Sequence, residues 1–183
     1  MQHNDFSDLI QTALACGAAK ATILPTEAVV LSPDFRAICA SNGCGHYGRC
    51  WMCPPDVGDI DALMARIRTY PWGLWYQTIA QIEDSFDIEG MQEGSFAHAR
   101  VGLRMQKKLL SVCGEGMLHL SCGGCRVCET CAKPAGEPCR RPGDALPSLE
   151  SYGVDVYQTT KETELKYING PNTVTFFGMV LFE

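Results

Sequence analysis

Two dense groups of cysteines constrain this chain more than any other feature of its sequence. The chain has 183 residues and eleven cysteines, and nine of the eleven fall within residues 39–53 and 122–139. A chain of this length can bury a hydrophobic core without covalent staples, so the cysteines are not required as scaffolding. In a reducing compartment, closely spaced thiols bind metal more often than they form disulfides. The grouping therefore predicts two metal-binding loops.

The later group has the spacing C-x2-C-x2-C-x2-C-x7-C. Three thiolates at x2 spacing can wrap a short loop around three irons of a cuboidal iron–sulfur cluster, while the fourth thiolate comes from farther away. We favour the register C-x2-C-x2-C-x7-C, because prolines on both sides of its last cysteine stiffen the backbone there. A second register, which stays open, starts at Cys122 and needs a more distant thiol. The four ligands of the favoured register are Cys125, Cys128, Cys131 and Cys139.

The earlier group has the spacing C-x4-C-x5-C-x2-C-P-P, which is less diagnostic. It ends in Cys-Pro, as the bacterial ferredoxin run does, and glycines within it suit a loop that closes around a cluster. His46 is either a further ligand or a packing residue of this loop. We predict a second cluster here, and its four ligands are Cys39, Cys44, Cys50 and Cys53.

Zinc is the main alternative to iron. All-thiolate zinc sites use paired C-x2-C knuckles, and Cys50 with Cys53 could combine with two cysteines of the later group. The gap between those pairs exceeds the usual spacing of a zinc ribbon, and the x2 run is crowded for a tetrahedral ion. A redox-active C-x2-C dithiol is a further alternative, although no helix N-terminus is evident beside it. We therefore predict two [4Fe–4S] clusters as the cofactors, with zinc as the alternative.

Three segments have the i, i+3, i+4 spacing of apolar residues that is typical of amphipathic helices. The helix expected over residues 6–14 has Asp5 as its N-cap and Gly17 as its stop. The other two expected helices span residues 59–71 and 94–112.

Short runs rich in β-branched and aromatic residues predict strands. The last of them, residues 173–182, has apolar residues on both faces, which places it inside a sheet. The turn residues NGPN join it to residues 164–168 and predict a C-terminal β-hairpin. The remaining runs are residues 21–24, 27–31, 35–39, 73–82, 117–121 and 154–160.

Helices and strands alternate along the chain, which predicts an α/β fold. We expect a single domain over residues 1–183, with a mixed sheet flanked by helices. The two cysteine-rich metal-binding loops then lie at strand ends, and the C-terminal β-hairpin completes the sheet. His98 and His119 are expected to pack in the core, and the isolated Cys16 and Cys113 to be small buried hydrophobic residues.

The formal net charge of -6 argues against a nucleic-acid-binding protein, because such domains present clustered positive charge. The first residues resemble no export signal, and no apolar run is long enough to span a bilayer. We expect a cytoplasmic protein with a redox partner protein and without a membrane or nucleic-acid partner, and we leave a homo-oligomer open. Positive charge at Lys133, Arg140 and Arg141 would raise a cluster potential and guide an acidic partner.

The two cysteine segments carry a resemblance to a known family. The stretch CASNGCGHYGRCWMCPP, followed by CRVCETC and by PCRRPGDALPSLESYGVDV, resembles a family of small predicted metal-binding proteins of unassigned function. The resemblance implies metal binding and hints at an anaerobic, redox-linked setting, without naming a reaction. Cys50 falls where relatives vary, and Cys122 is an extra. The residues that match the family pattern are Cys39, Cys44, Cys53, Cys125, Cys128, Cys131 and Cys139.

Whether Cys50 is a cluster ligand decides between two mechanisms. If Cys50 is a ligand, both clusters are fully held and the protein transfers electrons to or from an oxidoreductase or a methyl-transfer system. If it is not, one iron is open and could bind a small substrate or sulfur as a Lewis acid in a redox or lyase-type enzyme. A third hypothesis is a zinc-stabilised interaction module. The residues alone do not choose among the three, and they name no catalytic residue.

Overall fold

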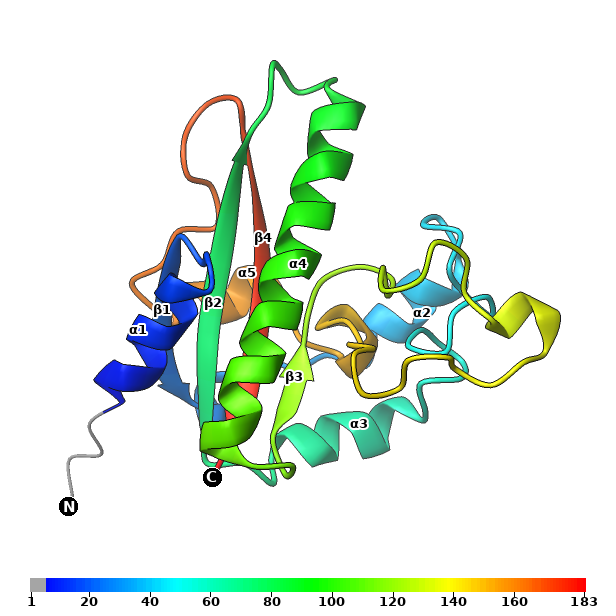
Figure 1. Cartoon of the computed structure of the whole chain (residues 1–183), viewed down its shortest axis with the longest axis horizontal. Helices are drawn as coiled ribbons and strands as arrows, with labels where there is room; N and C mark the ends of the chain where they lie inside the picture. The colour runs from blue at the N-terminus through cyan, green and yellow to red at the C-terminus, as the bar shows by residue number, and fades with distance from the viewer. Residues whose placement is uncertain (1–5) are drawn as a thin grey trace.

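A four-stranded antiparallel sheet lies at the centre of the computed structural model, which describes residues 6–183 (Figure 1). The strand order is β1-β2-β4-β3. β2 and β3 point the same way, but β4 lies between them and runs opposite to both. The α/β class is confirmed, and the described sheet is antiparallel rather than mixed. Its strands are β1 (Lys20–Pro25), β2 (Trp72–Gln81), β3 (Leu118–Leu120) and β4 (Thr173–Phe182).

Helices cover both faces of the sheet. Side chains of α1 (Ser7–Ala15) and α4 (Ile88–Cys113) pack on one face, and those of α3 (Ile60–Ile67) and α5 (Val156–Lys161) pack on the other. Within residues 6–183, no helix combines the length and apolar character needed to cross a bilayer. The shorter helices are α2 (Phe35–Ala40), η1 (Thr26–Ala28), η2 (Lys133–Ala135) and η3 (Glu150–Tyr152).

The two central strands alternate between the two cores. On β2, Leu74 and Tyr76 face α1 and α4, whereas Trp75 faces the opposite cluster. On β4, Met179 and Val180 alternate in the same way and both are fully buried. This alternation has the two-residue period of a strand buried on both faces. It confirms the prediction that residues 173–182 lie inside the sheet.

The three predicted helices are present. The helix over residues 6–14 is α1, and the cap proposed for it, Asp5, lies outside the described residues. The helix over 59–71 is α3, and that over 94–112 is α4. α4 begins earlier than predicted, because the Asp87 carboxylate accepts a hydrogen bond from the Gly90 N–H at 2.8 Å and so caps its first turn.

Three predicted strands are wrong. Residues 27–31 form η1 and an isolated bridge at Leu31, residues 35–39 lie in α2, and residues 154–160 mostly form α5. In α5, Asp155 accepts the Gln158 N–H at 2.9 Å, and this cap starts a helix despite the β-type composition. α2 buries none of its residues, so its apolar run has no place in the sheet.

The predicted C-terminal hairpin does not form either. Residues 164–168 are not a strand, and β4 pairs instead with β2 and β3. The Asn169 amide donates hydrogen bonds to the Lys166 carbonyl at 2.9 Å and to the Thr175 hydroxyl at 3.0 Å. These bonds fold the NGPN segment into a turn and occupy a carbonyl that a hairpin ladder would need.

Two histidines lie in the core, as the sequence predicts. His119 Nδ1–H donates to Gln106 Oε1 at 3.0 Å, so its Nε2 accepts the Tyr76 hydroxyl at 2.8 Å. His98 Nδ1 bonds to the Thr78 hydroxyl at 2.9 Å. Burial lowers the pKa of His98 to about 4 and that of His119 to about 3, so both imidazoles are neutral at pH 7. His119 anchors β3 immediately before the later cysteine loop, and His98 connects α4 to β2.

The Tyr76 ring lies so close to β4 that residue 178 must be glycine. A Cβ added to Gly178 would lie 2.3 Å from the Tyr76 ring, whereas one added to Gly116 would meet no atom within 4 Å. We expect Gly178→Ala to lower the free energy of unfolding by about 1–3 kcal/mol through overpacking. Gly116→Ala should change it by less than about 0.5 kcal/mol. Urea denaturation under reducing conditions measures both, and equal effects would contradict this packing.

Candidate metal centre

The two cysteine loops lie next to each other at one side of the molecule, beyond the end of β3 and beside α2 (Figure 1). All eleven cysteines are free thiols. Residues of both loops line two separate pockets, so each pocket combines segments that are far apart in the sequence. The loops therefore form one region of the fold rather than two independent sites.

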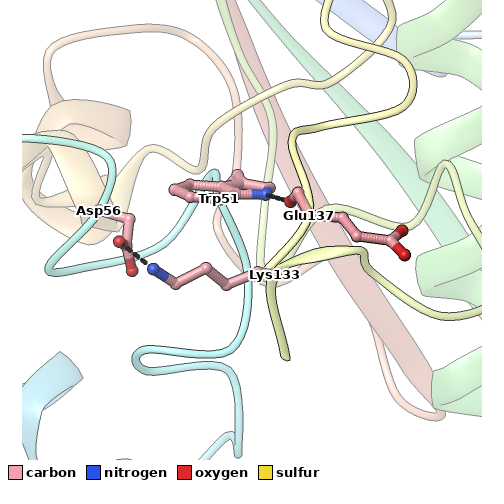
Figure 2. Close-up of polar contacts among 4 residues, drawn as sticks. All are labelled: Trp51, Asp56, Lys133 and Glu137. Carbon is pink, nitrogen blue, oxygen red and sulfur yellow. Dashed lines mark hydrogen bonds and ion pairs between the residues drawn. The ribbon is translucent and has the colours of Figure 1, made fainter. Parts of the chain in front are cut away.

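A cation and an indole ring dock the loops against each other (Figure 2). Lys133 pairs with the Asp56 carboxylate, and its Nζ lies 4.2 Å from the centre of the Trp51 ring. The Trp51 indole N–H donates to the Glu137 carbonyl at 3.0 Å. Asp56 and Lys133 are both largely shielded from solvent, which strengthens their attraction. These contacts connect residues 51–56 of the earlier loop to residues 133–137 of the later one.

The first pocket, which we call the five-thiol pocket, is lined by residues of both loops. It brings together the four predicted ligands of the later group and adds Cys50. Its other walls are mostly apolar, with Trp51 and Met52 from the earlier loop and Val127 from the later one. Its thiols are Cys50, Cys125, Cys128, Cys131 and Cys139.

The second pocket, which we call the three-thiol pocket, is also lined by residues of both loops. Its thiols are Cys39, Cys44 and Cys53, three of the four ligands predicted for the earlier group. Gly124 from the later loop and Glu150 from η3 line the same pocket. The His46 ring packs against Gly124, where an added Cβ would lie 2.7 Å away. His46 lines neither thiol pocket.

Cys50 lies between the two pockets. It lines the five-thiol pocket, yet its sulfur accepts a hydrogen bond from the Cys53 thiol, which lowers the pKa of Cys50 and raises that of Cys53. The Met52 and Cys125 N–H groups also donate to the Cys50 sulfur. Only 1% of Cys50 is exposed. The prediction that Cys50 belongs to the earlier ligand set stays a prediction, and its position allows it to serve either pocket.

The remaining cysteines line neither thiol pocket. Burial raises the pKa of Cys122 to about 12, and this thiol lies near apolar side chains such as Leu149 and Phe176. Cys16 is buried in the core between α1 and the sheet, and Cys113 packs against the same core. Cys16 is thus the small buried residue that the sequence predicts, whereas Cys113 is only partly buried.

Two of the pocket thiols, Cys39 and Cys125, are poor thiolates without a cation. Burial raises the pKa of Cys125 to about 11, although Val127 and Leu146 N–H groups donate to its sulfur, and it raises the pKa of Cys39. A bound metal centre reverses this effect because a coordinated thiol is deprotonated. Backbone N–H groups aimed at cysteine sulfur also tune the potential of iron–sulfur clusters. The donor set therefore fits such a cluster.

Within residues 6–183, no three Cys, His, Asp or Glu side chains converge closely enough to share one metal ion. Thiolates around an iron–sulfur cluster bind different irons, so they surround a cavity rather than meet at one point. The thiols of the five-thiol pocket likewise line the walls of one pocket and do not meet at one point.

Glu150 is a residue of the site that the sequence did not predict. It lies far from the cysteines in the sequence, and only the fold brings it to the three-thiol pocket. The segment PSLE, which belongs to the stretch that carries the family resemblance, was the one available signal. A carboxylate beside thiols adds an oxygen donor to the possible ligands.

A family model described as "Predicted metal-binding protein (DUF2284)" matches residues 22–182. The chain belongs to this family. The match covers the whole sheet except the first residues of β1 and contains every cysteine of both pockets. No curated protein and no solved structure matches the chain. The resemblance stated from the cysteine segments is confirmed, and this member of the DUF2284 family is accordingly a predicted metal-binding protein.

Removal of the Lys133 cation should loosen the docking of the two loops. In Lys133→Met, the Asp56 carboxylate loses its cation, and one of its buried oxygens already has no described hydrogen-bond partner. We expect the free energy of local opening to fall by about 1–2 kcal/mol. Alkylation of Cys50 in the metal-free, reduced protein should then be roughly five to thirty times faster. Mass spectrometry after timed exposure to iodoacetamide measures this rate.

The matched control is Lys166→Met, which removes the same charge from an exposed position. Cys50 should react there at the wild-type rate. Equal rates in all three proteins would show that the Lys133 contacts do not hold the loops together.

Proposed function

We propose that this protein holds two [4Fe–4S] clusters and transfers electrons to or from a partner oxidoreductase or methyl-transfer system. The observation that supports the proposal is the pair of neighbouring thiol-lined pockets, each built from both cysteine loops. A single zinc knuckle would need only one group of four thiols. Clusters in two such pockets would accept and release single electrons.

The chain's own residues would hold the clusters in two sets. One set is in the five-thiol pocket, with Cys125, Cys128, Cys131 and Cys139 as ligands. The other is in the three-thiol pocket, with Cys39, Cys44 and Cys53. Cys50 lies where it could complete either set. The apolar walls of the five-thiol pocket limit the access of water, which shapes the potential of a cluster there.

Charge around the five-thiol pocket is more balanced than the sequence suggests. Arg140 and Arg141 line the pocket, but Arg140 pairs with Glu137 at 2.6 Å and Arg141 pairs with Asp144. Exposed pairs of this kind leave only a weak net field. We therefore propose that hydrogen bonds to sulfur influence the potential more than these cations do. We also propose a redox protein as the partner and the reducing cytoplasm as the compartment, because eleven free thiols are stable there.

A second candidate is an enzyme in which one iron of the three-thiol pocket binds a small substrate or sulfur. The position of Cys50 on the other pocket favours it, because three thiols then remain for this site. An iron without a fourth thiolate can act as a Lewis acid.

Serine variants of one cysteine from each pocket test the proposal. Wild-type protein purified without oxygen should contain iron and acid-labile sulfide, and its reduced form should give two overlapping cluster signals in electron paramagnetic resonance. Cys128→Ser should weaken one signal and Cys44→Ser the other, each with a loss of up to about half of the iron. Cys16→Ser, in the core, should retain both signals. A colourless wild-type protein that contains zinc would contradict the proposal.

The Cys50→Ala variant tests the ligand sets themselves. We expect it to retain the wild-type iron content, because the five-thiol pocket still offers four thiols. Its spectrum should change little, apart from a shift in potential that follows the loss of a hydrogen-bonded sulfur. A loss of about half of the iron would instead place Cys50 in a ligand set, as the sequence predicts.

A further inference from the structure

The three-thiol pocket contains one carboxylate, that of Glu150, together with Cys39, Cys44 and Cys53. Glu150 is the first residue of η3 and follows Leu149, which is fully buried in the core. The Leu149 N–H donates to the Ser121 carbonyl at 2.8 Å, directly after β3. The backbone that carries Glu150 is therefore fixed to the end of the sheet and not to a free loop.

Hydrogen bonds hold the carboxylate of Glu150 on the side of the pocket formed by the later segment. It accepts hydrogen bonds from the Ser148 hydroxyl and from the Gly123 N–H, and both residues line the same pocket. Glu150 lies close enough to Cys39 that its negative charge contributes to the raised pKa of that thiol. The carboxylate thus shares the pocket with the thiols and does not point away into solvent.

No cation among the described residues forms an ion pair with Glu150. Arg36, which lies near Cys39, donates instead to the Gly58 carbonyl at 2.9 Å and to the Ser151 carbonyl at 3.3 Å. Burial raises the pKa of Glu150. The hydrogen bonds from Ser148 and Gly123 offset this burial only in part, so a bound cation would stabilise the carboxylate further.

A cuboidal cluster in this pocket would have three irons bound by the three thiols and a fourth iron without a cysteine. The thiol that could complete the set, Cys50, lines the other pocket. Glu150 is the remaining charged side chain that lines the three-thiol pocket, and carboxylate oxygen is an established ligand for iron.

We infer that Glu150 is the fourth protein ligand in the three-thiol pocket and binds the fourth iron through a carboxylate oxygen. This inference rests on the proposed function, because it needs a cluster in that pocket. It distinguishes the two clusters chemically: one has four thiolates, and the other has three thiolates and one oxygen. An oxygen ligand is harder than a thiolate and fits iron–sulfur centres less closely, so this iron is the one that exchanges most readily.

Mössbauer spectroscopy of the full chain, reconstituted without oxygen with isotopically enriched iron, tests the inference. Wild-type protein should show one iron site that is distinct from the others. Glu150→Cys should convert it to an ordinary thiolate site, and Glu150→Gln should make this iron easier to remove by mild oxidation, with a stronger [3Fe–4S] signal. Glu162→Gln, at an exposed position, should behave as wild type. Circular dichroism verifies that every variant is folded.

The outcomes separate this inference from the proposed function. A wild-type protein without iron and sulfide would remove the clusters and thus the proposed function. A wild-type protein with two clusters but no distinct iron site would overturn only the role of Glu150. A distinct site that persists unchanged in both Glu150→Cys and Glu150→Gln would also overturn it, because another ligand would then hold that iron.

Discussion

The docking of two loops through Lys133, Trp51 and Asp56 is the contact on which both pockets depend. The five-thiol pocket takes Cys50 and Trp51 from the earlier loop and its other thiols from the later one. The three-thiol pocket takes its thiols from the earlier loop and Gly123 and Gly124 from the later one. Neither loop forms a complete pocket alone, so the metal centre is a property of the folded chain rather than of one cysteine motif.

The sheet supplies the rigid support for these loops. β3 pairs with β4 on one side, and the Tyr76–His119–Gln106 hydrogen bonds fix it three residues before Cys122. Beyond its end, Ser121 bridges to Ser148, so the chain that leaves the sheet and the chain that returns to it are held together. Buried, hydrogen-bonded backbone of this kind opens rarely, which limits how far the pocket walls can move.

The sequence predicted the features that depend on local spacing. Apolar periodicity located α1, α3 and α4, and runs of β-branched and aromatic residues located β1, β2, β3 and β4. The x2 spacing identified the four thiols of the later group that share a pocket. Local composition predicted a strand where α5 forms, because the Asp155 cap outweighs the β-type residues there. It also predicted a hairpin before β4, where Asn169 instead forms a turn. These choices depend on single hydrogen bonds that periodicity does not reveal.

The sequence does not predict which thiols line which pocket, and the reason is different. Cys50 and Cys53 are only three residues apart, yet they line different pockets, because the loop that carries them passes between both. Glu150 joins the three-thiol pocket because Ser148 and Leu149, just before η3, pair with Ser121 at the end of β3, which is far away in the sequence. Spacing along the chain indicates which thiols can share a cluster, and only tertiary packing decides which ones do.

Anomalous X-ray scattering at the iron absorption edge, from crystals grown without oxygen, tests the central claim most directly. The account predicts two separate iron peaks, one among Cys125, Cys128, Cys131 and Cys139 and the other among Cys39, Cys44 and Cys53. A single peak shared by the two groups, or peaks that appear at the zinc edge and not at the iron edge, would contradict it.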